Sequence, residues 1–501
     1  MKILFLSFQE NSDIIGVKYL HAYIRSQGYD SSILLIPVVN ELNIKAGIQY
    51  ILDYQPAVLC ISAMTYEFYK AASFLKTLRK EFKDCLFVFG GIHATSDTPD
   101  CLSVSDIVVR GEGEETLTAL LDVYQNKSRA ELYNIPGIAY ASQGEIVYNP
   151  VNKLITDLDI LPYPGHLPER MFVLHKGQVQ PLQKAEIVKK YARYQGTFLS
   201  VTSSRGCPFS CSYCCNNILK SLYGKKNLRY RKWECVLDEI DQETRKFDTI
   251  LYVNFQDDCF LMHHPQWIED FSRSYKEKIS IPFIIRTTPR HITREKLTLL
   301  KEAGLRWVFM GMQTGSDDIN KKIYRRNVTA REYLEAATIV HDLHLSAWYD
   351  VILDNPYETL SDHLKTIDIL MKTPKPFQLD LFSLDYFPGT ELRSKAIADK
   401  IPIPEVGEKS YTEPEPKMIN KYIRMSATLP VFLMRLLIKI KDSTWGKIIG
   451  YLMYYVSLFI EPFVYLYLIF KSNDYNIPRT LKVLRAFSVT AFKKLFFRYQ
   501  G

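Results

Sequence analysis

The stretch Arg205-Gly206-Cys207-Pro208-Phe209-Ser210-Cys211-Ser212-Tyr213-Cys214 places three cysteines at the spacing C-x3-C-x2-C. Thiolates are the usual protein ligands of iron–sulfur clusters. Three of them hold three irons of a four-iron cluster and leave the fourth iron open to a substrate or cofactor. The alternative is a zinc site or a chance group of buried cysteines. Zinc prefers four ligands, commonly from paired C-x2-C units, and no second C-x2-C or H-x3-H pair follows Cys215.

The residues before the motif, Phe198 to Thr202, form a short apolar run with β-branched residues and predict a strand. A strand that leads directly into a cysteine loop is typical of the carboxyl end of a barrel strand, where barrel enzymes place their chemistry. Residues 197–395 as a whole predict a partial (β/α)6 barrel. Its other expected strands are Ile250–Phe255, Phe283–Arg286, Trp307–Met312, Ser346–Leu353 and Gln378–Asp385.

Residues 1–125 alternate strand and helix patterns and predict a doubly wound α/β sheet, in which ligands bind at the carboxyl ends of the strands. The expected strands are Lys2–Phe8, Ser32–Ile36, Ala57–Ala63, Leu86–Phe89 and Asp106–Val109. The last two strands end in glycine turns, Gly90-Gly91-Ile92-His93-Ala94-Thr95 and Gly111-Glu112-Gly113-Glu114. Neither turn is a G-x-G-x-x-G fingerprint, so from the residues alone both tight turns and ligand contacts remain open.

In combination, these motifs resemble the radical S-adenosylmethionine enzymes that carry a cobalamin-binding domain, and the resemblance covers residues 1–395. It implies that Cys207, Cys211 and Cys214 bind a [4Fe-4S] cluster whose open iron takes S-adenosylmethionine. Tyr213, the aromatic residue before the third cysteine, is expected near the adenine.

The two glycine turns are similar to the G-G-x-H-A/P-T/S and G-E-G-E turns of the family's cobalamin-binding domain. The resemblance implies a corrinoid site lined by Ser62, Met64, Thr65, Gly90, Gly91, His93, Gly111 and Glu112. The chain departs from the other cobalamin pattern, D-x-H-x-x-G, because no such motif occurs near Asn11 to Gly16. Cobalt therefore lacks a histidine ligand from that position.

Most strands of the expected barrel lead into polar or turn residues, which from the residues alone also fit helix caps and ordinary turns. By resemblance, Asp257, Asp258, Gln313 and Ser316 lie near S-adenosylmethionine or the substrate, and Pro356 lies near the adenine. The catalytic acid or base stays open among Asp257, Asp258, Tyr349 and Tyr386.

The predicted domains are a cobalamin-binding domain at residues 1–140, a linker at 141–196, the barrel at 197–395 and a helical region at 396–501. Within this division, a hairpin is expected around Ser142-Gln143-Gly144. The prolines at 162 and 164 indicate an extended linker path.

The basic character of the chain lies in its C-terminal region. The net charge of the 501 residues is +8, but residues 417–501 hold 14 Lys or Arg and 3 Asp or Glu. Ile448 to Phe470 is apolar except for Glu461, and Pro462 follows this carboxylate, so a re-entrant or in-plane helix is favoured over a clean span. Arg479 to Tyr499 mixes basic and apolar residues as interfacial helices do. The alternative is a helical cap on the barrel.

Nine cysteines without a disulfide-like pattern, and no signal peptide pattern after Met1, favour a cytoplasmic protein. The expected location is peripheral or monotopic on the inner face of the membrane. The resemblance implies a cobalamin-dependent methyltransferase that acts on an unactivated carbon of a lipid-like or natural-product substrate through a 5′-deoxyadenosyl radical. The alternatives are an oxidative cyclase and a non-catalytic corrinoid or cluster sensor. The expected partners are the substrate and a reductant such as flavodoxin or ferredoxin, with no nucleic acid.

Overall fold

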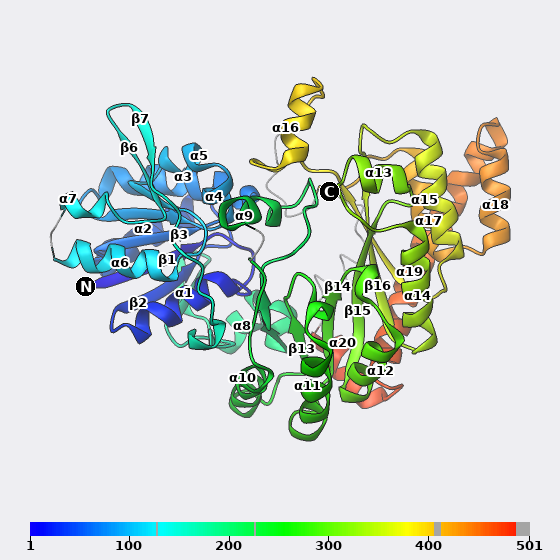
Figure 1. Cartoon of the computed structure of the whole chain (residues 1–501), viewed down its shortest axis with the longest axis horizontal. Coiled ribbons are helices and arrows are strands. Elements are labelled where there is room, and N and C mark those ends of the chain that lie inside the picture. The colour runs from blue at the N-terminus through cyan, green and yellow to red at the C-terminus, as the bar shows by residue number, and fades with distance from the viewer. Residues whose placement is uncertain (127–128, 225–226, 405–411, 487–501) are drawn as a thin grey trace. The chain divides into compact units, whose positions relative to one another are not determined.

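The computed structural model of the chain describes residues 1–126, 129–224, 227–404 and 412–486 (Figure 1). The described chain divides into two compact units. The N-terminal unit contains Met1–Gly196, Gly206–Arg231 and 386–404, and the barrel unit contains Thr197–Arg205, Lys232–Asp385 and 412–486. The cysteine loop therefore belongs to the N-terminal unit, although the sequence on either side of it belongs to the barrel.

The N-terminal unit is built on one nine-stranded sheet with the order β7-β6-β5-β4-β3-β1-β2-β8-β9. Its strands are β1 (Lys2–Ser7), β2 (Asp30–Leu35), β3 (Val58–Ser62), β4 (Leu86–Gly90), β5 (Ile107–Val109), β6 (Ile138–Ser142), β7 (Glu145–Tyr148), β8 (Met171–His175) and β9 (Gln178–Pro181). The ladders from β5 to β2, and from β2 to β8, are parallel. The predicted doubly wound fold and the hairpin around Ser142-Gln143-Gly144 are confirmed.

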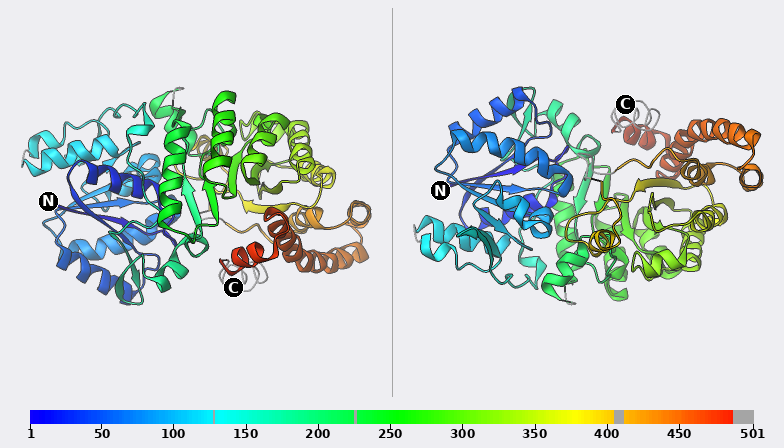
Figure 2. Two further views of the ribbon diagram at one scale, coloured as in Figure 1. Left: turned by 90° about the horizontal axis from the view of Figure 1, so that it is seen from below. Right: turned by 90° about the horizontal axis from the view of Figure 1, so that it is seen from above.

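Helices cover both faces of this sheet (Figure 2). The helices of the unit are α1 (Ile15–Ser26), α2 (Glu41–Tyr54), α3 (Thr65–Glu81), α4 (Ile92–Ser96), α5 (Thr98–Leu102), α6 (Glu114–Gln125), α7 (Arg129–Leu132), α8 (Ala185–Tyr191), α9 (Asn216–Tyr223) and α16 (Glu391–Ala398). Because both faces are covered, strands such as β1 are buried along nearly their whole length. This burial explains why the strands read as continuous apolar runs in the sequence.

The linker predicted at 141–196 is wrong in its middle part. Strand β8 pairs with β2 in parallel, and β9 returns antiparallel to β8, so this segment completes one edge of the first sheet. The sequence signal was weak because Met171 to His175 is short and is followed by a two-residue turn at Lys176 and Gly177, both with positive φ.

The barrel unit contains a six-stranded, all-parallel sheet in the order β10-β13-β14-β15-β16-β17. These strands are β10 (Phe198–Val201), β13 (Tyr252–Phe255), β14 (Phe283–Thr287), β15 (Leu305–Gln313), β16 (Ser346–Leu353) and β17 (Gln378–Ser383), and two short strands, β11 (Ser204–Arg205) and β12 (Arg229–Tyr230), flank the cysteine loop in the sequence. All six predicted strands are present in the predicted order, which confirms the partial (β/α)6 barrel.

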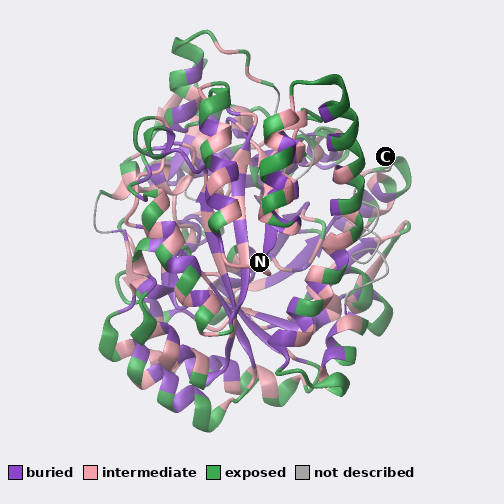
Figure 3. Cartoon of the chain, turned by 90° about the vertical axis from the view of Figure 1, so that its right-hand side faces the viewer, coloured by how far each residue is buried: buried purple, intermediate pink, exposed green. Residues whose placement is uncertain are grey.

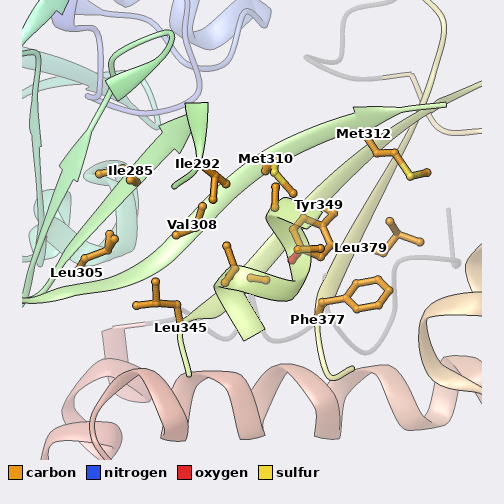
Figure 4. Close-up of a cluster of buried hydrophobic side chains, with 14 of the residues drawn as sticks. Ile285, Ile292, Leu305, Val308, Met310, Met312, Leu345, Tyr349, Phe377 and Leu379 are labelled. Atoms are coloured by element: carbon orange, nitrogen blue, oxygen red, sulfur yellow. The ribbon is translucent and has the colours of Figure 1, made fainter. Parts of the chain in front are cut away.

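Helices follow the barrel strands and cover the outer face of the sheet. They are α10 (Trp233–Lys246), α11 (Pro265–Lys278), α12 (Arg294–Ala303), α13 (Asp317–Lys322), α14 (Ala330–Asp342) and α15 (Leu360–Lys372). Alternate strand residues, among them Ile285, Val308, Met310, Tyr349 and Leu379, form the core beneath these helices (Figure 4). Most strand residues are buried, whereas the helices present exposed outer faces (Figure 3).

Within the described residues 412–486, the chain forms the helices α17 (Met418–Thr428), α18 (Val431–Ile440), α19 (Thr444–Ser472) and α20 (Ile477–Ala486). Helix α19 continues past Pro462 and is long and apolar enough to cross a membrane, with 33% of its most apolar window buried. Glu461 is not a lone carboxylate, because it accepts hydrogen bonds from Arg424 of α17 at 2.6 and 2.9 Å. The second half of the predicted interfacial segment, residues 487–499, lies outside the described residues.

Helix α19 closes the end of the barrel at which the strands begin (Figure 4). Ser346, the first residue of β16, donates a hydrogen bond to the carbonyl oxygen of Leu468, at 3.0 Å. The ring of Tyr465 lies against those of Trp307 and Trp348. The predicted helical cap is therefore present on one face of α19, and it lies opposite the strand ends where barrel enzymes place their chemistry.

Candidate active site

The cysteine loop is held by its own backbone and by the helix that follows it. The N–H of Cys214 donates to the carbonyl oxygen of Cys211, and that of Asn217 donates to the carbonyl oxygen of Cys214, each at 3.1 Å. Lys220 of α9 donates from Nζ to the carbonyl oxygen of Pro208 and to the hydroxyl of Ser210, both at 2.7 Å. Because the lysine bridges two residues of the loop, the loop is anchored before any metal binds.

The chemistry of the donors fits an iron–sulfur cluster. All nine cysteines lie in the described chain, and none forms a disulfide. Burial raises the pKa of the thiols of Cys60, Cys101 and Cys259, and raises that of Cys85 to about 12, so these four stay protonated at neutral pH. Of the other five cysteines, Cys207, Cys211 and Cys214 stand at the C-x3-C-x2-C spacing and are the best thiolate donors by position. Among the described residues, no group of three Cys, His, Asp or Glu is arranged to hold a single metal ion.

Most of the predicted corrinoid residues gather at the carboxyl ends of β3 and β4. Ser62 and Gly90 are register partners there, and β1 and β3 flank the point where the strand order reverses, the usual ligand position of such sheets. Gly91 has φ +91, and a Cβ atom on it would lie 2.7 Å from the Ser62 hydroxyl oxygen. The turn thus requires glycine. Met64 is exposed at the start of α3, and Thr65 is buried beside it.

His93 is the polar side chain at this edge that best fits a bound group. It is 1% exposed, and its Nδ1 lies 3.3 Å from the Thr65 hydroxyl. Its Nε2 has no hydrogen-bond partner within the described part of the chain and lies 3.8 Å from a carboxylate oxygen of Asp100. Burial lowers the pKa of His93 to about 4, so the imidazole is neutral at neutral pH. A buried nitrogen without a partner fits a cofactor that supplies one.

The other predicted corrinoid residues, Gly111 and Glu112, have protein partners of their own. The N–H of Glu112 donates to the hydroxyl of Tyr223 at 2.8 Å, and the carboxylate of Glu112 pairs with Arg229. Both carboxylate oxygens of Glu112 accept hydrogen bonds from Arg229, in the segment after the cysteine loop, so its place in the corrinoid site stays a prediction. Sequence reasoning missed this pairing because 117 residues separate the two partners.

Asp257 holds the barrel strand that leads into the cysteine loop. It is 1% exposed, and its carboxylate accepts hydrogen bonds from the N–H and hydroxyl of Ser203 and from the hydroxyl of Ser204. Burial raises the pKa of Asp257, and the hydrogen bonds from the two serines oppose that rise. The carboxylate is thus a tether at the end of β10 rather than an open ligand, while Asp258 is exposed.

The predicted residues after β15 and β16 separate into two groups. Gln313 has φ +69 at a register shift that ends β15 and is half-buried, and Pro356 is exposed. Both are accessible to a cofactor at the strand ends. Ser316 is fully buried, and its hydroxyl donates to Asp362 at 2.7 Å, so its contact with cofactor or substrate stays a prediction.

The inner face of the barrel carries a charged group that the sequence prediction missed. Asp350 of β16 and Asp380 of β17 are register partners on neighbouring parallel strands, and Arg286 of β14 donates to the side-chain oxygen of Asn254 at 3.0 Å. Burial and the negative charge of Asp380 raise the pKa of Asp350 to about 7, against the effect of Arg286 and Arg326. The sequence signal for this group was Asp350 itself, a charged residue within the otherwise apolar strand β16.

Asp350 is a better acid or base for the interior than the two tyrosines considered from the sequence. Tyr349 points into the outer core against Tyr333 and Phe377 and is 1% exposed. Tyr386 is 4% exposed, and burial raises its pKa to about 12. Neither phenol ionises near neutral pH, whereas the Asp350 carboxyl changes its protonation there.

A cysteine loop after the first strand of a partial barrel, joined to a doubly wound cofactor domain, defines a radical S-adenosylmethionine enzyme. Residues 201–370 match the Radical SAM superfamily, and residues 1–121 match the B12 binding domain. The chain belongs to the radical SAM superfamily and, within it, to the cobalamin-binding enzymes. Its cofactors are a [4Fe-4S] cluster, S-adenosylmethionine and cobalamin.

Named relatives include both methyltransferases and cyclases. The chain is 26% identical to "Uncharacterized methyltransferase PH0819" of Pyrococcus horikoshii, over 94% of this chain and 93% of the relative. It is 29% identical to the anaerobic magnesium-protoporphyrin IX monomethyl ester cyclase of Rubrivivax gelatinosus, over 73% of this chain but 65% of the cyclase. The solved structure of the radical enzyme OxsB with aqua-cobalamin has the same fold, with a TM-score of 0.66 at 16% identity over 99% of this chain and 81% of OxsB.

Replacing Cys207, Cys211 or Cys214 singly with alanine is expected to abolish the cluster, because each removes one of three thiolate ligands. Iron analysis and electron paramagnetic resonance of the anaerobically reconstituted protein should fall from about four irons per chain to below one. The matched control is Cys85→Ala, which removes a buried thiol outside the loop. Full iron content in a loop variant would contradict the assignment.

Asp350 should make stability depend on pH. Its folded pKa of about 7 lies above the usual carboxyl value, so the stability it contributes at low pH is lost as the pH rises through 7. Asp350→Asn removes this titration, so its melting temperature relative to the wild type should rise between about pH 5 and pH 8. Asp380→Asn should flatten the wild-type profile by removing the neighbouring charge. Parallel profiles for all three proteins would contradict the shift.

Proposed function

We propose that this protein is a cobalamin-dependent radical methyltransferase that transfers a methyl group to an unactivated carbon of a small molecule. The carrying observation is the relative PH0819, which bears the name methyltransferase and aligns with the chain over 93% of its own length. The cyclase relative aligns over 65% of its length. The proposal therefore follows the relative that the chain covers over nearly its whole length.

The residues of this chain would hold and orient the cofactors. Cys207, Cys211 and Cys214 would hold the cluster, and the edge around Ser62, Gly91 and His93 would hold the corrinoid. When bound, these groups and S-adenosylmethionine supply a carbon radical and a methyl donor, and the protein supplies orientation and exclusion of water. Gln313, Asp258 and Pro356 are the accessible strand-end residues proposed to contact S-adenosylmethionine.

The test is methyl transfer from methyl-labelled S-adenosylmethionine to candidate substrates by the reduced, corrinoid-loaded enzyme. Methylation is expected to place the label in the product and to yield 5′-deoxyadenosine together with S-adenosylhomocysteine. An oxidised product that contains no label would favour the cyclase reaction. Reduction without any 5′-deoxyadenosine, even with active controls, would favour a sensor. Asp350→Asn should lower the turnover with little change in corrinoid content if the carboxyl handles a proton in the barrel.

We also propose that α18 and α19 dock on an anionic membrane surface. Large apolar side chains that face outward include Phe432, Trp445, Leu452, Tyr455, Phe459 and Phe463, from 53% to 76% exposed. In α19, Leu452, Tyr455, Phe459 and Phe463 recur every three or four residues, and Trp445 lies seven residues, about two turns, before Leu452, so they form one stripe. The exposed cations Arg435, Lys439 and Lys447 flank it, and this charge is what favours an anionic lipid surface over a second copy of the chain.

The packing of α19 favours an in-plane helix rather than a span. Its opposite face is held by the Arg424–Glu461 pair, and Lys471 donates to the carbonyl oxygen of Leu345 at 3.1 Å. Crossing a bilayer would break these contacts. The apolar stripe lies on a helix at the end of the barrel where the strands begin, opposite the end where barrel enzymes bind their substrates. Membrane docking through this helix is therefore independent of the substrate, and it does not support a lipid substrate.

The double variant Trp445→Ser with Phe459→Ser should reduce co-sedimentation with vesicles of anionic lipid by about tenfold, because two exposed aromatic side chains leave the interface. Ile397→Ser, which changes a residue 60% exposed on α16, is the matched control. Binding should weaken with salt. Equal sedimentation of all variants, or a wild type that ignores vesicles and forms a dimer through this face, would overturn the membrane proposal.

A further inference from the structure

The turn after β5 packs tightly against the segment that follows the cysteine loop. Gly111 has φ +79, and a Cβ atom there would lie 1.8 Å from the hydroxyl oxygen of Tyr223. The next residue, Glu112, donates its N–H to that same hydroxyl at 2.8 Å. Tyr223 is the last residue of α9, the helix that begins two residues after Cys214. Glycine is required here for a protein contact, whatever else binds nearby.

A forked ion pair extends this contact. Arg229 donates from Nη2 to Oε1 of Glu112 at 2.6 Å and from Nη1 to Oε2 at 2.9 Å. The side chains are only 10% and 19% exposed, and Nη1 also donates to the carbonyl oxygen of Ile155 at 2.6 Å. Two parallel charge-assisted bonds fix the orientation of a guanidinium, which a single surface contact does not.

The fixed guanidinium reaches the cysteine loop through one peptide group. Nε of Arg229 donates to the carbonyl oxygen of Asn227 at 3.2 Å. This same oxygen lies 2.3 Å from the position that a Cβ atom of Gly206 would take, and Gly206 has φ +92. Gly206 directly precedes Cys207, so the carbonyl group of Asn227 sets the path by which the chain enters the first cysteine.

The side chain of Asn227 is the unexplained group in this arrangement. The residue is 3% exposed, and neither the oxygen nor the nitrogen of its amide has a hydrogen-bond partner among the described residues. A buried amide without partners costs stability, and native structures rarely keep one without a reason. A ligand held by the neighbouring cysteines would supply the missing partner.

We propose that Glu112, Arg229 and Asn227 form a positioning relay for the cluster loop, in which the Asn227 amide hydrogen-bonds to the bound cluster or its S-adenosylmethionine. The relay links the turn expected to touch the corrinoid with the first cluster ligand. None of the three residues performs chemistry. They fix the loop and, through the amide, raise the reduction potential of the cluster, since hydrogen bonds to its sulfurs favour the reduced form. The inference requires a bound cluster but not methyl transfer.

The first test is the reduction potential of the cluster in Asn227→Leu, followed by electron paramagnetic resonance in a redox titration of the full chain. The iron content should stay near that of the wild type, because the thiolates remain. The oxidised-to-reduced ratio at a fixed potential should rise about tenfold, which is about 59 mV for a one-electron couple. An unchanged potential, with and without S-adenosylmethionine, would overturn the role of the amide.

The second test separates the relay from simple packing. Arg229→Lys keeps a positive charge beside Glu112 but cannot reproduce the bond from Nε to the Asn227 carbonyl. We expect it to shift the spectrum and potential in the same direction as Arg229→Gln. Wild-type behaviour of Arg229→Lys would overturn the relay.

The control is Arg170→Gln, which breaks an exposed ion pair with Asp30 in the same unit and should leave the cluster unchanged. If the Arg229→Gln variant folds but loses iron while the control keeps it, the relay is needed to hold the cluster as well as to tune it. Because every readout is taken on the cluster, a failed methyl-transfer assay leaves this result intact.

Discussion

Parallel strands joined by helices bring their following loops to one edge of a sheet, and this constraint governs both units of the protein. In the N-terminal unit it gathers Ser62, Gly91 and His93 at neighbouring strand ends. In the barrel unit it brings the end of β10 beside that of β13, where Asp257 holds Ser203 and Ser204. The cysteine loop begins two residues later. The barrel strand and the Asn227 carbonyl that Arg229 holds therefore fix the entry of the loop, and Lys220 fixes the course that follows.

The strands and helices could be predicted because the apolar pattern of a buried parallel strand lies within the strand's own residues. Strands buried on both faces must be continuously apolar, so β1 and β16 could be found from composition. The hydrogen-bond partners of individual side chains lie far away in the sequence, so the local apolar pattern could not predict them. Ser316 bonds to Asp362, and Glu112 bonds to Arg229. For these two residues the structure shows a protein partner, which the motif alone did not indicate.

In the C-terminal helices, the same apolar sequence pattern is compatible with packing against the barrel and with contact with a membrane. Helix α19 is apolar around most of its circumference, which from sequence fits both a buried cap and a membrane helix. In the structure, one side of α19 packs against the barrel and the other side is exposed. Tyr465 faces the barrel tryptophans, whereas Phe459 and Phe463 face outward. Glu461, costly if alone in an apolar setting, is neutralised by Arg424 of α17. Periodicity could indicate the helix, but not which side the barrel would cover.

The chain leaves the barrel unit at Arg205, contributes residues 206–231 to the N-terminal unit, returns at Lys232, and leaves again at Tyr386. Neither unit is therefore a contiguous stretch of gene. A recombination that exchanged residues 1–196 for those of a relative would import a new Glu112 position while keeping the old Arg229. Such a chimera keeps the ion pair only where the relative supplies an acidic residue at the position of Glu112. The N-terminal unit is thus inherited as separate stretches of sequence, and the cysteine loop is inherited together with the barrel sequence on either side of it.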